Sequence, residues 1–300
     1  MNVTVDTPDA SELADLVQVL GEWHREGGPF QLHPGDVGWF GWHGDDVTAR
    51  ALRVWRRREQ PVAIGLLDGP GLLRLGIAPH AMEDGDIAAV VAADIGHEDG
   101  RVLPAGDADV EAPSTAALRD ALVVSGWTKG DPWTHLRHDL TDPVEVIGQL
   151  RVQIVDERTV HARTAVHRAA FGSDRFTVDR WHAVAAGPAY ASARCLLGWS
   201  GDDAVAAVTV WSAGEGRPGI VEPMGVHPDH RGRGHGAAMS AAGASVLREF
   251  GASSVVVGTP TSNAGAVATY VAAGFAPFAE VADLRRAEAK GRHEDPTRVP

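Results

Sequence analysis

Alternating glycine and basic residues follow a strand-like segment in the stretch VEPMGVHPDHRGRGHG, residues 221–236. An alanine-rich run with high helix propensity comes next. The start of a helix binds phosphate well, because its N–H groups are unpaired and carry a partial positive charge. Glycine lets the backbone approach the anion, and arginine adds charge-assisted hydrogen bonds. The stretch predicts a phosphate site at a glycine–arginine segment that consists of Arg231, Gly232, Arg233, Gly234, His235 and Gly236.

The spacing of these glycines distinguishes between kinds of phosphate ligand. A dinucleotide fingerprint needs G-x-G-x-x-G, whereas this segment reads G-x-G-x-G, and the chain has no Gly-Lys-Ser/Thr tripeptide of a P-loop. The pattern Arg231-x-x-Gly234-x-Gly236 after a strand instead resembles the coenzyme A pyrophosphate loop of the GCN5-related N-acetyltransferases, the GNAT family. The alternative is a glycine-rich turn that only caps a helix.

A second stretch, residues 253–275, carries the same resemblance. Asn263 is a favourable helix N-cap, and Tyr270 lies seven residues later on the same helix face. The pattern Asn-x-x-Ala-x-x-x-Tyr-x-x-x-Gly-Phe is similar to the late helix of the GNAT family, in which the tyrosine stands beside the coenzyme sulfur. The alternative for Tyr270 is a core residue with a satisfied hydroxyl group.

The resemblance implies transfer of an acetyl group from acetyl-CoA to a primary amine of a small molecule, by direct attack through a tetrahedral intermediate. Acetyl-CoA is then a co-substrate, and no metal is implied. The N–H groups of the glycine–arginine segment would hold the pyrophosphate, with the Arg231 side chain as an extra contact. Asn263 and Tyr270 would complete the coenzyme site, and Tyr270 would return a proton to the departing thiolate.

The strand before the glycine–arginine segment would hold the pantetheine arm. The resemblance implies that Met224, Gly225 and Val226 pair with this arm as another strand would, and that the Met224 N–H points at the thioester oxygen. Proline cannot donate to a sheet ladder and glycine weakens one. Pro223 and Gly225 therefore suit a strand that splays from its neighbour and opens a cleft.

Glu222 is the candidate general base for the attacking amine. If the strand is regular, Glu222, Met224 and Val226 alternate onto one side, and the carboxylate faces the cleft. Two alternatives stay open. Glu222 would instead bind local backbone or an arginine, or a bulge at Pro223 would turn it elsewhere.

Composition excludes several classes of partner. The net charge of -13 argues against nucleic acid and anionic membranes as partners. Cys195 is the only cysteine, which excludes an intrachain disulfide or a thiolate metal cluster. The histidines at 227, 230 and 235 have a spacing that hints at a metal, but no carboxylate or cysteine pattern accompanies them, so no metal is expected. We read no signal peptide or membrane span, and we expect a cytoplasmic, bacterial protein that is a monomer or homodimer.

The elements that must position these residues repeat at about half the chain length. Gly76-Ile77-Ala78-Pro79 aligns with Gly225-Val226-His227-Pro228, and residues 114–127 align with residues 262–275. The acidic sequence HAMEDGD follows Pro79 where the glycine–arginine segment would stand, and Leu122 replaces Tyr270. The alternative is two unrelated α/β domains.

We therefore predict an α/β (α+β) protein of two GNAT-like domains. Each has a mixed, mostly antiparallel sheet that is flanked by helices and splayed at its central strand. The first half, residues 1–143, is a degenerate domain without a phosphate loop, and WTHLRHDL is its final strand. The second half, residues 150–287, is the catalytic domain and ends in the strand VADLRR; residues 288–300 form a flexible tail.

Two further hypotheses of function compete with that of a small-molecule N-acyltransferase. The first is a non-catalytic module that binds acyl-CoA or a partner. The second, narrower reading is an amino-sugar acetyltransferase of the mycothiol synthase type, which is similar in size and two-domain layout, although no motif identifies that substrate.

Overall fold

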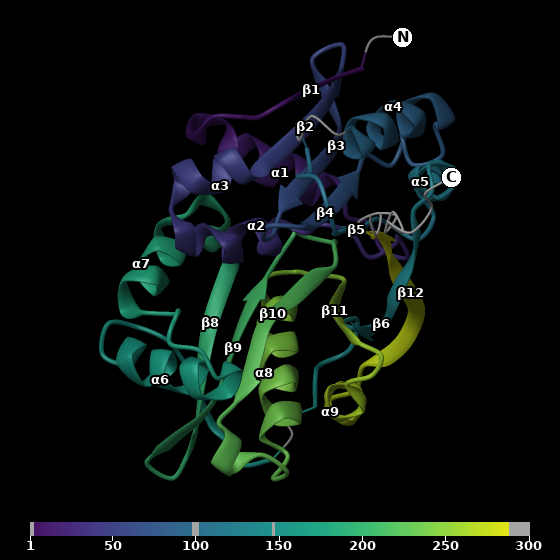
Figure 1. Ribbon diagram of the computed structural model, residues 1–300. Coiled ribbons are helices and arrows are strands. Elements are labelled where there is room, and N and C mark those ends of the chain that lie inside the picture. The colour runs from purple at the N-terminus through teal and green to yellow at the C-terminus, as the bar shows by residue number, and fades with distance from the viewer. Residues whose placement is uncertain (1–2, 98–101, 146–147, 288–300) are drawn as a thin grey trace, which may run out of the picture.

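One sheet of twelve strands runs through the whole molecule (Figure 1). The computed structural model describes residues 3–97, 102–145 and 148–287. The strand order is β1-β2-β3-β4-β5-β12-β6-β11-β10-β9-β8-β7, so the two halves lie end to end along one continuous ladder. The predicted mixed, mostly antiparallel and helix-flanked architecture is confirmed, but the two halves share one sheet instead of each forming its own.

The described residues of the first half form six strands and five α-helices. Leu13, Leu16 and Leu20 recur at helical spacing and are buried, which explains why the first helix packs on the sheet. The strands are β1 (Val3–Asp6), β2 (Leu52–Arg57), β3 (Gln60–Leu67), β4 (Leu72–Ile77), β5 (Ala108–Glu111) and β6 (Thr128–Asp139). The helices are α1 (Leu13–Trp23), α2 (Pro34–Phe40), α3 (Asp45–Ala51), α4 (Gly85–Gly96) and α5 (Ala117–Val124), with a short 3-10 turn η2 (Gly41–His43) after α2.

The second half repeats this order with longer strands. β8 and β9 are buried along most of their length, as strands covered on both faces are, and they form a hairpin around the turn at Gly201, whose φ of 62° suits glycine. The strands are β7 (Arg151–Ile154), β8 (Ala193–Ser200), β9 (Asp203–Trp211), β10 (Gly219–Val226), β11 (Ser254–Pro260) and β12 (Ala276–Arg286). The helices are α6 (Val160–Phe171), α7 (Val178–Ala186), α8 (His235–Glu249) and α9 (Ala264–Ala272).

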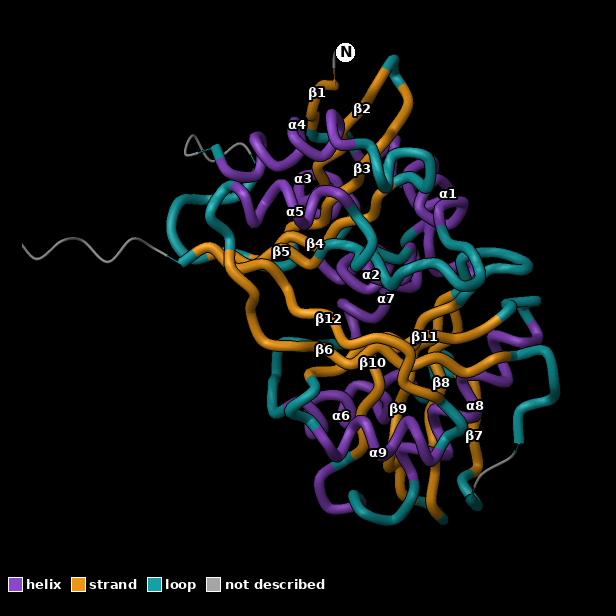
Figure 2. The backbone as a smooth tube through the Cα atoms, turned by 90° about the vertical axis from the view of Figure 1, so that its right-hand side faces the viewer, coloured by secondary structure: helices purple, strands orange, loops and turns teal. Residues whose placement is uncertain are grey.

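The last strands of the two halves are exchanged. β6, the end of the first half, pairs with β11 of the second half, and β12, the end of the second half, pairs with β5 of the first. β6 and β12 also pair with each other, and both cross the middle of the molecule in Figure 2. The two halves are therefore joined by backbone hydrogen bonds as well as by side-chain packing.

Helices cover both faces of the sheet in the second half. α8 packs on one face with Val208, Val210 and Val221, and α6 and α7 cover the other face with Cys195 and Leu197. Among the described residues, no helix is both long and apolar enough to cross a membrane.

Candidate active site

β10 and β11 separate in the middle of the second half. They run parallel, and only two residue pairs join them, Gly219 with Val255 and Ile220 with Val256. Beyond Ile220, β10 continues beside β9 as far as Val226. The predicted splay is therefore present, and it leaves one edge of β10 uncovered.

The backbone of Met224 and Val226 points into this opening. The N–H of His227 donates to the carbonyl of Val205 in β9 at 2.8 Å. His227 and Val205 are therefore a hydrogen-bonded pair of this antiparallel ladder. In an antiparallel ladder such pairs alternate with pairs whose N–H groups point away from the partner strand. Val226, opposite Ala206, and Met224 therefore direct their N–H groups toward the side that β11 has left. We call Met224 to Val226 the open edge of β10.

Gly225 has a packing role on the opposite face of this edge. A Cβ at Gly225 would lie 2.7 Å from the Cβ of Ala170 and 3.0 Å from the ring of Phe171. Only glycine therefore lets the end of α6 lie this close to β10.

The glycine–arginine segment leads from the open edge into α8. Gly232 and Gly234 have φ angles of 73° and 79°, which glycine adopts without strain. Gly234 is the N-cap of α8 and supplies no side-chain acceptor, so the first N–H groups of α8 are left for an external partner. Gly236 lies in the first turn of α8, where a Cβ would come within 2.7 Å of Thr269 on α9.

The two arginines of this segment donate hydrogen bonds to backbone carbonyl groups next to it. Arg231 donates to the carbonyls of Val226 at 3.2 Å and of Ala170 at 2.8 Å, and Arg233 donates to the carbonyl of Asp229 at 3.2 Å. The Arg231 guanidinium is thus already engaged on two of its nitrogens.

Histidine adds no positive charge to the segment at neutral pH. Burial, followed by the nearby His230 and Arg233 side chains, lowers the pKa of His235. Within the described part of the chain, no group of three histidine, cysteine or carboxylate side chains is arranged to hold a metal ion.

Tyr270 lies across the opening, on α9. Its ring belongs to the same apolar cluster as Met224 and Val226, and it lies 5.6 Å from the ring of Phe275. The Asn263 side chain accepts from the N–H of Ala266 at 3.1 Å, so it caps the helix as expected. Burial, followed by the carboxylate of Glu222, raises the pKa of Tyr270. The phenol therefore stays protonated at neutral pH and can serve as a proton donor.

The predicted alternation of Glu222 with Met224 and Val226 is wrong. Val221 pairs with Val210 and Met224 pairs with Val208, so two residues, Glu222 and Pro223, oppose a single residue of β9. This is a β-bulge, and it shifts the alternation by one residue. The Glu222–Pro223 peptide bond is cis. Glu222 consequently faces the side opposite to Met224, as the alternative of a bulge at Pro223 required.

Glu222 opens onto a cavity of about 410 Å³ between the two halves. We call it the interhalf cavity. Burial raises the pKa of Glu222, while the Arg74 guanidinium opposes that rise. Glu222 and Arg175 come from the second half. The first half contributes Asp36, Trp39, Phe40, Trp42, His43, Leu67, Asp68, Gly69 and Arg74.

A buried histidine fixes α2, which carries Asp36, Trp39 and Phe40 of this wall. Nδ1 of His33 accepts from the N–H of Gly35 at 2.9 Å and caps α2. Because Nδ1 accepts, Nε2 carries the proton, and it lies 3.1 Å from the carbonyl of Pro218, directly before β10. Burial holds the pKa of His33 well below its usual value, which agrees with a neutral ring. This histidine ties the first half to the strand that bears Glu222.

Sequence reasoning missed the contribution of the first half to this cavity. Asp36, Asp68 and Arg74 are more than 140 residues from Glu222 in the chain, and no spacing rule connects them. The glycine- and aromatic-rich stretch between Pro34 and His43 was the one available signal, because such a stretch is unusual for a surface loop.

In the first half, the edge that corresponds to the open edge of β10 is occupied. The N–H of Ala78 donates to Val62 of β3 at 3.0 Å, so the N–H of Ile77 points away from β3. The side-chain oxygen of Gln31 accepts from Ile77 at 3.0 Å, and the N–H of Leu32 donates to the carbonyl of Leu75 at 3.1 Å. The chain's own residues 31–32 thus lie where the repeat would place a pantetheine arm.

In the first half, the N-terminus of the corresponding helix, α4, is occupied by a capping side chain. Asp84 caps α4 and accepts from the N–H groups of Asp86 and Ile87, both at 3.1 Å. In α8 the corresponding position is Gly234, which has no side chain to cap with. A carboxylate therefore occupies the place at which α8 offers its N–H groups.

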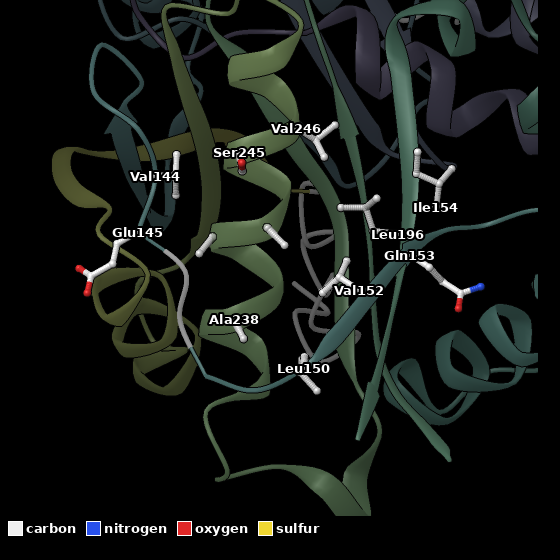
Figure 3. A pocket seen from close by; sticks show the side chains of 12 residues that line it. Val144, Glu145, Leu150, Val152, Gln153, Ile154, Leu196, Ala238, Ser245 and Val246 are labelled. Carbon is white, nitrogen blue, oxygen red and sulfur yellow. The ribbon is translucent and has the colours of Figure 1, made fainter. Parts of the chain in front are cut away.

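A separate apolar pocket of about 330 Å³ lies between α8 and β7 (Figure 3). Val152, Leu196 and Val246 line it, and neither Glu222 nor Tyr270 does. Glu145 and Gln153 project outward from its rim in Figure 3. It therefore offers no acid–base pair for chemistry.

Comparisons with known proteins agree with this geometry. The family model "Acetyltransferase (GNAT) family" matches residues 160–275. An acetyltransferase of the GNAT family from Colwellia psychrerythraea has 14% identity, covers 95% of this chain and 99% of its own, and gives a TM-score of 0.62. A GCN5-related N-acetyltransferase from Sphaerobacter thermophilus has 19% identity, covers 95% of each chain, and gives a TM-score of 0.56.

A third similar structure has two such domains. It is a tandem GNAT protein from the clavulanic acid biosynthesis pathway, with 16% identity, coverage of 96% of this chain and 99% of its own, and a TM-score of 0.55. No curated protein matches the chain. The family match falls on the half that holds the open edge, the glycine–arginine segment and Tyr270, and the likeness to the tandem protein extends over both halves. Residues 160–275 therefore match the GNAT family of acetyltransferases, and the chain as a whole has a fold similar to that of a tandem GNAT protein.

Proposed function

We propose that the second half transfers an acetyl group from acetyl-CoA to a primary amine of a small molecule that binds in the interhalf cavity. The observation that supports this most directly is the continuity of three features. The open edge of β10 runs from the bulge at Glu222 to the uncapped start of α8, and Tyr270 stands across the opening. Under this proposal catalysis belongs to residues 150–287, and residues 1–143 shape the acceptor site.

The residues around the opening fit the coenzyme. The first N–H groups of α8 would hold the diphosphate, and the open edge would pair with the amides of the pantetheine arm. Acetyl-CoA supplies a reactive thioester when it is bound. The Met224 N–H would donate to the thioester oxygen as negative charge develops there.

Proton movement would be shared between the two sides of β10. The amine must be neutral to attack the carbonyl carbon, so Glu222 would accept its proton, directly or through water. As the new C–N bond forms and the C–S bond breaks, the electron pair of the latter goes to sulfur. Tyr270 would give that sulfur a proton, which yields a free thiol and an amide.

A binding assay followed by a turnover assay tests this proposal. We expect acetyl-CoA at a hundredfold excess over its dissociation constant to stabilise the fold by about 2.7 kcal/mol in thermal unfolding. Acetyl-pantetheine lacks the diphosphate and should stabilise it far less, which tests the role of the helix start. A panel of primary amines is then scored for release of free thiol. Stabilisation without turnover for any amine would support the non-catalytic module instead, and equal stabilisation by both thioesters would reject the assigned phosphate site.

A further inference from the structure

The charged side chains that line the interhalf cavity differ in how they are paired. The acidic group consists of Asp36, Asp68 and Glu222 with Arg74. The Arg74 guanidinium lies 3.3 Å from Asp36 and 3.0 Å from Asp68, so it neutralises part of their charge. Arg175 lines the cavity from the turn before α7, and among the described residues no carboxylate forms an ion pair with it. Arg175 is therefore a cation of the cavity wall that is open to an external anion.

The pKa shifts of two lining residues place the positive charge near α7. Burial raises the pKa of Glu222, and Arg74 is the cation that opposes this rise. The pKa of His43 is lowered by burial and then by the guanidinium groups of Arg180 and Arg175. The positive field of these two arginines therefore acts on the part of the cavity around His43.

Three arginines surround the stacked pair of Trp39 and Trp42, whose ring centroids lie 5.9 Å apart. The guanidinium carbons of Arg175 and Arg180 lie 5.8 and 4.3 Å from the ring centroid of Trp42. That of Arg163 lies 5.6 Å from the ring centroid of Trp39. Because a guanidinium group is planar, it can pack against an aromatic ring and still direct N–H groups at an anion.

The two arginines behind the tryptophan pair carry charge that the protein leaves unbalanced. Arg163 is 1% exposed, and its guanidinium donates to Sγ of Cys195 at 3.2 Å and to Oγ1 of Thr209 at 3.5 Å. Within the described ranges, Nη1 of Arg163 and Nη1 of Arg180 are buried and have no hydrogen-bond partner. A buried cation without a counter-ion is costly, so an anion bound nearby would lower the free energy of this arrangement.

We propose that the acceptor amine also carries a carboxylate, that Arg175 binds this carboxylate, and that Arg163 and Arg180 strengthen the binding through their positive field. Arg175 makes the direct contact because it is exposed and lines the cavity. A single accessible guanidinium matches a planar carboxylate through two parallel N–H···O bonds. The amine then lies toward Glu222, and the carbon skeleton between the two groups packs against the aromatic wall. This inference rests on the proposed function, because it names the substrate class of the same site.

A matched pair of acceptors isolates the effect of the carboxylate. 4-(Aminomethyl)benzoate and 4-(aminomethyl)benzamide share the ring and the aminomethyl group, and they differ in charge at the far end. With acetyl-CoA, the wild-type protein should favour the benzoate by about tenfold in kcat/KM, the effect of one charge-assisted pair in a partly exposed site. Arg175→Gln should remove this preference through a higher KM for the benzoate, and it should leave kcat/KM for the benzamide within about twofold.

Two further variants separate geometry and charge from general effects of substitution. Arg175→Lys keeps the charge but loses the paired N–H geometry, so it should retain only part of the preference. Arg158 is exposed in the turn before α6, as Arg175 is in the turn before α7, but it does not line the cavity. Arg158→Gln is therefore the matched control and should behave as wild type.

Binding is measured separately from turnover so that the outcomes can be distinguished. Acetyl-CoA should stabilise every variant equally in thermal unfolding. Calorimetric titration of both compounds into the protein without coenzyme tests the cavity even if no amine turns over. Tighter binding of the benzoate without any turnover would reject the proposed function and support the carboxylate site. Equal affinity for the two compounds, binding of neither, or an Arg175→Gln variant indistinguishable from Arg158→Gln would overturn the inference.

Discussion

Replacement of Tyr270 by phenylalanine removes one oxygen atom from the opening and leaves the ring in place. The ring is buried with Phe275 and the open-edge side chains, whereas no hydrogen bond of the hydroxyl group is found among the described residues. Because no protein hydrogen bond is lost and the volume hardly changes, we expect the free energy of unfolding to change by less than about 1 kcal/mol.

The effect on turnover should be much larger. The raised pKa keeps the phenol protonated over the neutral range, so it is available as an acid whenever the thiolate departs. Loss of one general acid typically costs about a hundredfold or more in rate. We therefore expect kcat to fall by about a hundredfold and the dissociation constant of coenzyme A to stay within about twofold.

Three measurements check this expectation on the same preparation. Single-turnover kinetics with free-thiol detection report the chemical step, calorimetry gives coenzyme affinity, and thermal unfolding gives stability. Tyr190 is the other tyrosine of the chain, and it lies in the cluster around Trp211, so Tyr190→Phe is the matched control. A single-turnover rate for Tyr270→Phe within about threefold of wild type would show that the phenol is not the proton donor.

Two further expectations concern the acid on β10 and the filled edge of the first half. Burial raises the pKa of Glu222 above its usual 4.5, and only the carboxylate form accepts a proton. We therefore expect kcat/KM to fall with decreasing pH, with a midpoint above 4.5. Glu222→Gln should lower kcat/KM and abolish this acidic limb of the pH profile. A Glu222→Gln profile that keeps the same limb would assign the titration to another group. Because Gln31 and Leu32 occupy the edge of β4, calorimetry should give one coenzyme per chain, and two would contradict this assignment. Gln31→Ala should lower stability by about 1–3 kcal/mol, since it leaves the buried N–H of Ile77 without an acceptor.

Local sequence patterns predicted the second half well, because its signals act over short distances. Positive-φ glycines, an uncapped helix start and an asparagine N-cap each depend on a few consecutive residues, and the structure has all three at residues 232–236 and 263. The repeat was visible for the same reason.

Features that depend on contacts between residues far apart in the chain could not be predicted from local sequence patterns. The orientation of Glu222 depends on how Val221 and Met224 pair with β9, and a regular strand and a bulged one have the same sequence pattern until pairing is known. The interhalf cavity lies between α2 and a strand of the second half, and no hydrophobic periodicity predicts that these two elements come together. The strands WTHLRHDL and VADLRR were placed as strands, but nothing local indicated that they would change places.

The exchange of β6 and β12 has a consequence for synthesis on the ribosome. One edge of β5 pairs with β4, but on its other edge Ala108, Asp109 and Val110 pair with Arg286, Arg285 and Leu284, which are translated long after β5. Until then the emerging chain carries an unfinished ladder whose bare edge is open to wrong partners. Neither half can be cut out as a complete unit, because each fragment would take with it a strand that belongs to the other.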